Sequence, residues 1–280
     1  MNLRVPVRKP AVRGTFYPAD AGELCRMAGR FLQAASERIL PGRPSALVVP
    51  HAGYAFSGPI AGSGFVQLIR HAADVHRVIL LGPSHYQDFE GLAACDEDAF
   101  ETPMGMVHVD RNYVHKLEAR QQVRIDSHLH QHEHCLEVQL PFLQFILHDF
   151  RIVPLVTGRA RSWEIADLLE ESAHDPNCLI LVSTDLSHYF TYRKAHHMDR
   201  LTRLAIENLD ESALTGESAC GRTALAGLIC LARRLGWEGR CLDLRNSGDI
   251  CGNHRQVVGY GAWAFYEPGQ ERLNEGLPEN

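Results

Sequence analysis

The fold class is decided by Ala46-Leu47-Val48-Val49-Pro50-His51-Ala52-Gly53-Tyr54 and by Val78-Ile79-Leu80-Leu81-Gly82-Pro83-Ser84-His85-Tyr86. Each stretch begins with an apolar run of the length of a buried strand and continues into a turn that contains a histidine. A helical stretch from about Pro59 to Arg70 lies between them. A strand, a helix and a strand in this order predict a right-handed crossover and a parallel pair of strands.

The alternation of strands and helices continues along the chain. Apolar runs predict further strands at Arg151–Val156, Leu179–Val182, Cys241–Arg245 and Val257–Phe265. Helical patterns are found at Ala21–Glu37, His134–His148, Ser162–Ser172, Lys194–Asn208 and Arg222–Leu235. This order favours a three-layer α/β sandwich around a mixed, largely parallel sheet. We expect a single domain over residues 1–280, with a polar tail after about residue 268.

Composition argues against several classes of function. The 280 residues carry a formal net charge of −6 with scattered Lys and Arg, so nucleic acid is not an expected partner. No apolar run approaches the ~20 residues that span a bilayer, and the N-terminus lacks a signal-peptide pattern, so we expect no membrane association and a cytoplasmic location. The 8 cysteines include no C-x-x-C pair, which argues against a zinc ribbon or a thioredoxin-type motif.

Histidine is the informative residue type, because the chain has 16 of them and neutral imidazole is the commonest metal ligand. His51 and His85 follow two predicted strands, and Asp185 and His188 follow a third. In open α/β sheets the ligand crevice lies beyond the carboxyl ends of the strands. We therefore predict that these side chains face one pocket. The alternative is that each histidine only caps a turn.

Cys220 precedes Gly221-Arg222 and an apolar helical run, so we expect it at a helix N-terminus. There the helix dipole and the free N–H groups favour the thiolate, which is the form that binds metal. An inert buried cysteine is an equally good interpretation of the local sequence. The His-rich stretch from His128 to His132 is compatible with a surface metal-binding tract or with a solvated loop.

Five ordered motifs resemble the successive signatures of the Memo family. They are Pro50-His51-Ala52-Gly53-Tyr54, Gly82-Pro83-Ser84-His85, Glu133-His134-x-x-Glu137-x-x-Leu140-Pro141-Phe142, Ser183-x-Asp185-x-Ser187-His188 and Cys220-Gly221-Arg222. The N-terminal Pro10-Ala11-Val12-x-Gly14-Thr15-Phe16-Tyr17-Pro18 resembles the prokaryotic members, called AmmeMemoRadiSam system protein B. The resemblance covers nearly the whole chain.

The Memo family in turn resembles the LigB-type class III extradiol dioxygenases, in which two histidines and a carboxylate hold Fe(II). This resemblance implies a LigB-like fold, with His51 and His85 as metal ligands and Cys220 in place of the acidic ligand. His188 falls where the dioxygenases keep an acid/base histidine, and His134 matches the histidine of their His-Gly-containing loop. Because a thiolate softens the site, copper and zinc compete with iron. We expect one metal ion per chain, Fe(II) or copper, with zinc as a further alternative.

Two main hypotheses about function follow. The first is a non-haem iron- or copper-dependent redox enzyme, in which His188 transfers protons and Asp185 orients an imidazole or a metal-bound water. Glu133 and His134 are then expected to line the pocket. The second is a non-catalytic adaptor that reuses the crevice for a peptide or protein, as the resemblance to animal Memo proteins implies.

A zinc hydrolase with the same ligands is a third hypothesis, but the sequence lacks an H-E-x-x-H motif. The resemblance also implies AMMECR-type and radical-SAM system proteins as partners. The substrate, a small molecule or a peptide, is not specified by the sequence.

Overall fold

The computed structural model describes residues 6–269, and a nine-stranded sheet forms its centre. Four strands run parallel in the middle of the sheet, in the order β2 (Ala46–Val49), β9 (Cys178–Ser183), β3 (Arg77–Pro83) and β8 (Arg151–Thr157). Antiparallel pairing extends it through β12 (Val257–Tyr266), β11 (Glu238–Asn246) and β10 (His188–Phe190) on one side and β4 (Leu92–Ala94) on the other. Beyond β4, β7 (Val123–Ile125) pairs parallel with it. The prediction of a mixed sheet with a parallel centre is confirmed.

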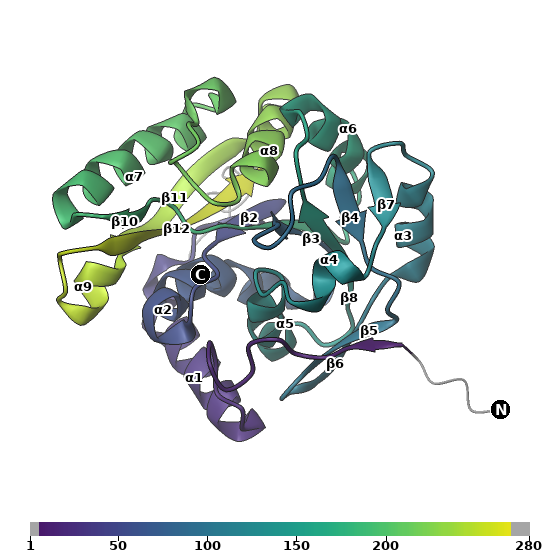
Figure 1. Cartoon of the computed structure of the whole chain (residues 1–280), viewed down its shortest axis with the longest axis horizontal. Helices are drawn as coiled ribbons and strands as arrows, with labels where there is room; N and C mark the ends of the chain where they lie inside the picture. The colour runs from purple at the N-terminus through teal and green to yellow at the C-terminus, as the bar shows by residue number, and fades with distance from the viewer. Residues whose placement is uncertain (1–5, 270–280) are drawn as a thin grey trace, which may run out of the picture.

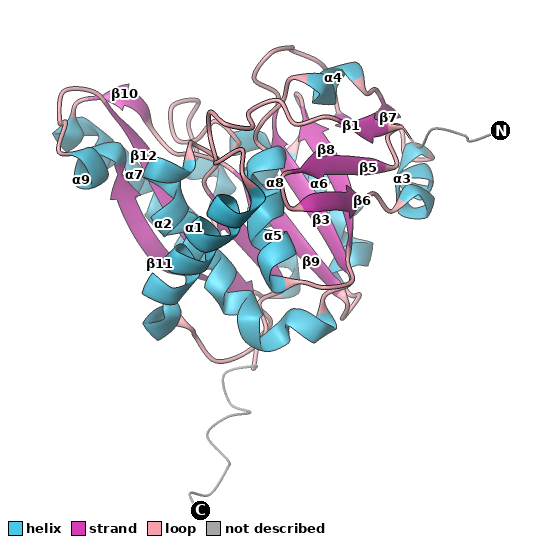
Figure 2. Cartoon of the chain, turned by 90° about the horizontal axis from the view of Figure 1, so that it is seen from below, coloured by secondary structure: helices cyan, strands magenta, loops and turns pink. Residues whose placement is uncertain are grey.

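Helices cover both faces of this sheet (Figures 1 and 2). One layer contains α1 (Ala21–Ala34), α2 (Tyr54–Phe65) and α5 (Leu140–Ile146), and α2 packs on β2 and β12. The opposite layer contains α6 (Ser162–Ala173), α7 (Tyr192–Glu207) and α8 (Arg222–Leu235), which pack on β9, β11 and β3 respectively. The central strands are buried between the two layers, so the predicted three-layer arrangement is confirmed.

Shorter elements lie around this sandwich, and the sequence patterns did not predict them as separate elements. A separate three-stranded sheet consists of β1 (Val7–Arg8), β5 (Ala99–Thr102) and β6 (Gly105–His108). The short helices are α3 (Arg111–Glu118), α4 (His128–Gln131) and α9 (Ser247–Cys251). The 3-10 helices are η1 (Ser36–Arg38), η2 (Val66–Asp74), η3 (Glu137–Gln139) and η4 (Glu211–Ala213). These elements are too short to produce a clear hydrophobic period.

The predicted pairing of the first two strands is wrong in one respect. Strands β2 and β3 are parallel, but β9 is inserted between them and pairs with both. The inserted strand is apolar from Cys178 to Val182, so it can be buried on both faces. Because β9 lies between them, the loop after Ser183 lies between the loops that carry His51 and His85.

Two predicted helices have different boundaries. Helix α2 begins at Tyr54 rather than near Pro59, because the Tyr54 N–H donates to the Phe16 carbonyl at 2.7 Å, a contact from a distant part of the chain. The helix predicted from His134 is reduced to η3 and α5. The Glu133 carboxylate accepts the N–H groups of His134 and Cys135, so this segment forms a turn around that side chain.

None of the helices within residues 6–269 is both long and apolar enough to cross a membrane. Nearly all of the predicted polar tail lies outside the described residues.

Candidate metal centre

Three histidines meet at the carboxyl edge of the central strands. His51 follows β2 and His85 follows β3, and their ring centroids are 5.1 Å apart. His134 lies 5.5 Å from the ring of His51 and is stacked on His85 at 4.7 Å. One ring nitrogen from each histidine lies within 4.8 Å of the others, close enough for a shared metal ion. His51 and His85 therefore meet as the strand pattern predicts.

The hydroxyl of Ser183, the last residue of β9, fixes the ring of His51. Ser183 Oγ donates to the Cys135 carbonyl at 2.6 Å and accepts from Gln139 Nε2 at 2.8 Å. Since its only proton is used, it acts as an acceptor toward His51 Nδ1 at 3.0 Å. Nδ1 therefore carries the proton, and Nε2 presents a free lone pair to the centre.

The Glu133 carboxylate fixes the ring of His85 through Nδ1. Its two oxygens accept from the His85 N–H and from His85 Nδ1, both at 2.8 Å. A carboxylate has no proton to donate, so His85 Nδ1 is the donor, and Nε2 is the ring nitrogen that remains for a metal. Burial by itself raises the pKa of Glu133, but the hydrogen bonds and the charge of His85 outweigh it and hold this pKa at about 2.

Two of the three histidines are held in the neutral form. Burial, followed by repulsion from His85, lowers the pKa of His51 to about 3. Burial and repulsion from His51 lower the pKa of His134 to about 4. At neutral pH both side chains are uncharged imidazoles, which is the form that coordinates a metal.

Cys220 lies beside His51, just before the N-terminus of α8. Its Sγ is 3.3 Å from His51 Nε2 and accepts the Asp185 N–H at 3.3 Å. Gly221 permits this approach, because a Cβ there would lie 2.7 Å from the Cβ of Thr184. The thiol is partly buried and lies within reach of an ion bound to His51.

The expectation of a thiolate at this helix N-terminus is wrong for the metal-free protein. Burial, followed by the negative charge of Asp185, raises the pKa of Cys220 to about 12. The N–H groups around the sulfur favour the thiolate but are outweighed. A metal bound by Cys220 must therefore displace a proton from it.

Asp185 and His188 stand close to the three histidines. The buried Asp185 accepts the main-chain N–H of His51 at 2.8 Å, so it fixes the loop that carries this histidine. Orientation of an imidazole ring by Asp185 stays a prediction. Partly buried His188 begins β10, and its charge contributes to the lowered pKa of His51 after burial and His85. Proton transfer by His188 also stays a prediction.

A second compact group consists of His85, Glu133 and Cys135. The Cys135 thiol is buried and donates to the Pro83 carbonyl at 3.3 Å. Burial and the neighbouring Glu133 raise its pKa well above the usual value. We therefore interpret Cys135 as a packing residue rather than a ligand.

The N-terminal segment forms one wall of the centre. The Phe16 ring lies edge-on to His134, at 4.9 Å between centroids. This segment is tied down by buried Glu137, which accepts from the Ala11 N–H at 2.7 Å and from the Tyr17 hydroxyl at 2.6 Å and pairs with Arg8.

The centre opens into a cleft of about 370 Å³ that is lined by His85 and Cys220. Tyr86, Asp88 and Arg159 are among its other lining residues, and Asp88 and Arg159 form an ion pair. The cleft has the size of a small-molecule site.

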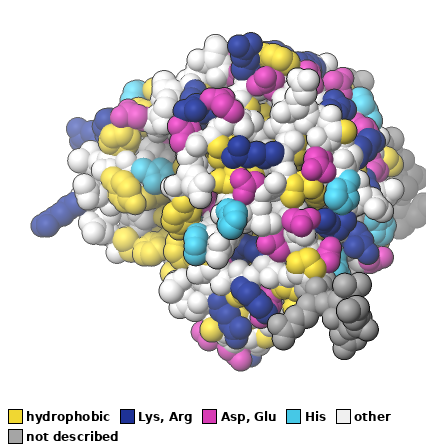
Figure 3. Space-filling view, turned by 45° about the vertical axis from the view of Figure 1, so that its right-hand side comes forward, with side chains coloured by type: hydrophobic (Ala, Val, Ile, Leu, Met, Phe, Trp, Pro, Cys, Tyr) yellow, Lys and Arg dark blue, Asp and Glu magenta, His cyan; other side chains and the backbone are white. Residues whose placement is uncertain are grey.

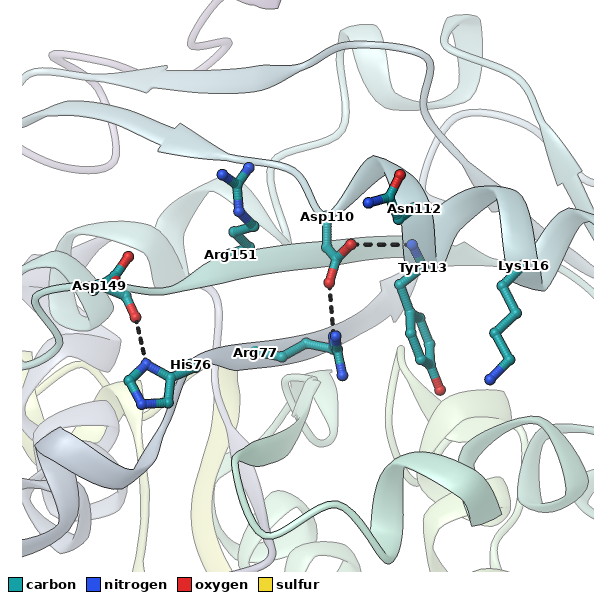
Figure 4. A pocket seen from close by; sticks show the side chains of 8 residues that line it. All are labelled: His76, Arg77, Asp110, Asn112, Tyr113, Lys116, Asp149 and Arg151. Carbon is teal, nitrogen blue, oxygen red and sulfur yellow. Dashed lines mark hydrogen bonds and ion pairs between the residues drawn. The ribbon is translucent and has the colours of Figure 1, made fainter.

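A larger cavity, of about 540 Å³, lies at the opposite edge of the sheet, where β3 and β8 begin (Figure 4). There Arg77 is paired with Asp110 at 2.8 Å, and Lys116 is paired with Glu171 outside the view. This cavity has no part in the histidine centre.

The residues fit a metal ion of the late first-row type. Two imidazoles whose Nδ1 atoms are held by hydrogen bonds, a third imidazole and a thiol suit iron, copper or zinc, whereas calcium and magnesium prefer oxygen ligands. The donor set alone does not select among the three metals.

The sequence interpretation missed Ser183, Gln139 and Glu137 as supporting residues. Ser183 and Glu137 belong to two of the five ordered motifs, but their hydrogen-bond partners are distant in sequence. A serine inside a strand or a glutamate before a helix carries no local signal of a buried hydrogen bond.

The chain is similar to known proteins over nearly its whole length. A family model described as "Memo-like protein" matches residues 8–264. A MEMO1 family protein of Methanopyrus kandleri is 36% identical over 281 residues, covering 92% of this chain and 98% of that protein. MEMO1 family proteins of Aquifex aeolicus and Aeropyrum pernix are 34% and 37% identical, each over 91% of this chain and over 97% and 98% of their own lengths. The chain therefore belongs to the Memo family.

Proposed function

We propose that this Memo-family protein binds one iron or copper ion at His51, His85 and Cys220 and catalyses an oxidation–reduction reaction. The observation that carries the proposal is the pair of imidazoles whose Nδ1 atoms are held by Ser183 and Glu133, with a thiol sulfur 3.3 Å from Nε2 of His51. Such orientation of ligands by their hydrogen-bond partners is typical of metal sites. Zinc is the competing ion for the same ligands.

The remaining residues have separate roles in this proposal. Iron or copper supplies one-electron chemistry when bound. Asp185 holds the His51 loop through its main-chain N–H, and His134 adds a third imidazole that can bind the ion or a substrate. His188 holds or moves a proton at its ring, which is the common role of a histidine in acid–base catalysis. The substrate is a small, polar molecule that fits the cleft above His85 and Cys220.

Family resemblance supports the setting of the reaction. We propose a cytoplasmic protein that works beside AMMECR-type and radical-SAM system proteins. Co-purification of the untagged protein with such partners, compared between the native chain and a variant of the cleft such as Arg159→Ala, tests this association.

Metal analysis tests the centre. Untagged protein reconstituted without oxygen with Fe(II) or Cu(I) should retain about one ion per chain after desalting, and His51→Ala, His85→Ala and Cys220→Ala should each lower this content. His148→Ala is the matched control, because His148 is an exposed histidine outside the centre. If the three variants retain as much metal as the control, the proposed centre is wrong.

Oxygen consumption tests the redox step. With a reductant, the loaded protein should consume oxygen faster than the same concentration of free metal, and His188→Ala should lower the rate while the metal content stays unchanged. A rate equal to that of free metal contradicts catalysis. Peptide binding that survives loss of all three ligands would favour the adaptor hypothesis instead.

A further inference from the structure

The short helix α4 carries two exposed histidines that the central site does not use. His128 is the first residue of α4 and His132 is its C-cap, so they are four residues apart on one helical turn and lie on the same side of it. Both line one cavity of about 470 Å³, together with Glu97. Figure 2 shows α4 at the edge of the molecule toward which β3 and β8 point.

The basic side chains that line this cavity are engaged by acidic partners outside its lining. Arg8 and Lys9 also line it, but Arg8 is paired with buried Glu137 and Lys9 with Glu101. Glu97 forms no ion pair within residues 6–269, so its carboxylate is available to a bound cation.

We propose that His128, His132 and Glu97 form a second, outer binding site for a divalent transition-metal ion that prefers imidazole, such as Zn²⁺, Ni²⁺ or Cu²⁺. Ser127 Oγ donates to Glu97 Oε2 at 2.9 Å and so orients this carboxylate. The three ligand groups line the cavity without yet meeting. Because both imidazoles are exposed, rotation of their side chains, which takes picoseconds to nanoseconds, brings them together around the ion.

The neighbouring histidines separate the outer site from the central one. His130, between the two ligands, is buried and its Nε2 contacts the Ala93 carbonyl at 2.8 Å, so it is not part of the outer site. His132 lines the outer cavity, and its ring lies 6.4 Å from that of Tyr86, which lines the cleft of the central site. On the face shown in Figure 3, exposed histidines lie among acidic and basic side chains. A variant that removes exposed histidines elsewhere is therefore needed as a control for nonspecific metal binding. The outer site needs no ion at His51 or His85 and is independent of the proposed function.

Calorimetric titration of untagged protein with Zn²⁺ alone tests the proposal. We expect two classes of binding in the wild type. In the double variant His128→Ala/His132→Ala, the affinity of the weaker class for Zn²⁺ should fall about tenfold or more, so that this class is lost. The tighter class should remain. Glu97→Gln should weaken the same class while both imidazoles remain. The matched control is His115→Ala/His148→Ala, which removes two exposed histidines elsewhere and should leave both classes intact.

A single class in the wild type, or a weaker class that survives in the His128→Ala/His132→Ala variant, overturns the proposal. Equal loss of the weaker class in the control variant overturns it as well. The variant His51→Ala/His85→Ala should lose only the tighter class. If His51→Ala/His85→Ala keeps both classes of binding while His128→Ala/His132→Ala loses the weaker class, the proposed central site is wrong and the proposal of an outer site is supported.

Discussion

The Nδ1 atoms of His51 and His85 are held by different chemical groups, a hydroxyl in one case and a carboxylate in the other. A carboxylate on Nδ1 makes the imidazole a stronger metal ligand, because it stabilises positive charge on the ring. Glu133 also holds the main chain of His85, so one side chain sets both the position and the basicity of this ligand.

Replacing Glu133 should therefore weaken metal binding without removing a ligand. We expect Glu133→Gln to lower the affinity for Zn²⁺ or Fe(II) about 10- to 100-fold, measured by competition with a chromophoric chelator. Glu118→Gln is the matched control, because Glu118 contacts His115 Nδ1 at 3.4 Å in an exposed pair. Wild-type affinity in Glu133→Gln would contradict the role of this carboxylate.

Proton release distinguishes Cys220 from His134 as the third ligand. At pH 8 the Cys220 thiol is protonated, because its pKa is raised to about 12, whereas His51 and His134 are already neutral. Binding through Cys220 should release about one proton per ion, and binding through three imidazoles should release none. Titration calorimetry with Zn²⁺ in buffers of different ionisation enthalpy measures this number.

The variants make this measurement decisive. Cys220→Ser should lose the proton release, and His134→Ala should keep it. If the wild type releases no proton, the centre uses the three histidines without the thiol.

At the residue scale, the sequence predicts which side chains meet better than it predicts their protonation. His51 and His85 were predicted because strand ends meet at one edge of the sheet. The protonated state of Cys220 could not be predicted, because it depends on burial and on Asp185, which reaches the thiol only through the tertiary fold.

At the scale of elements, the N-terminal segment and the turn before α5 form one unit. Buried Arg8 pairs with Glu137 and also donates through Nε to the His130 carbonyl at 3.1 Å. This pair connects β1 to the segment that carries Glu133 and His134. A buried ion pair that loses one partner leaves an uncompensated charge, which is strongly destabilising.

Glu137→Gln should consequently lower the free energy of unfolding by about 3–5 kcal/mol. The adjacent pair Lys9–Glu101 is the control, because the Lys9 side chain is 73% exposed and such a pair contributes only about 0–1 kcal/mol. Urea unfolding of Glu137→Gln and Glu101→Gln in the metal-free protein measures both values. Equal stability of the two variants would show that the buried pair is not needed.

The elements themselves were predicted well where the hydrophobic period is long. The predicted helix Arg222–Leu235 has the boundaries of α8, and the strand Ala46–Val49 those of β2. The insertion of β9 between β2 and β3 was missed, because strand order depends on long-range pairing that no local pattern encodes. The start of α2 was missed for the same reason, since its first N–H is capped by the distant Phe16 carbonyl.

At the scale of the whole molecule, buried histidines make stability depend on pH. Burial lowers the pKa values of His51, His130 and His134 to about 3, 4 and 4, below the value of about 6.5 in an unfolded chain. At pH values between the folded and the unfolded pKa values, the unfolded chain binds more protons than the folded one. Stability therefore falls as the pH falls from about 6.5 to 4. Asp199 and Asp185 act in the opposite direction, because burial raises the pKa of Asp199 to about 6 and also raises that of Asp185, but they are two groups against three.

His130 is the group to change, because it is buried outside the central site and its Nδ1 has no hydrogen-bond partner within the described residues. His130→Asn should lower stability at pH 7 and should also flatten the pH dependence between pH 4.5 and 6.5, by up to about 1.4 kcal/mol per pH unit. Urea unfolding of the metal-free protein at several pH values measures this slope. His128→Asn, which changes an exposed histidine two residues away, should leave the slope as in the wild type. An unchanged slope in His130→Asn would mean that this histidine is protonated equally in the folded and unfolded chains, contrary to its burial.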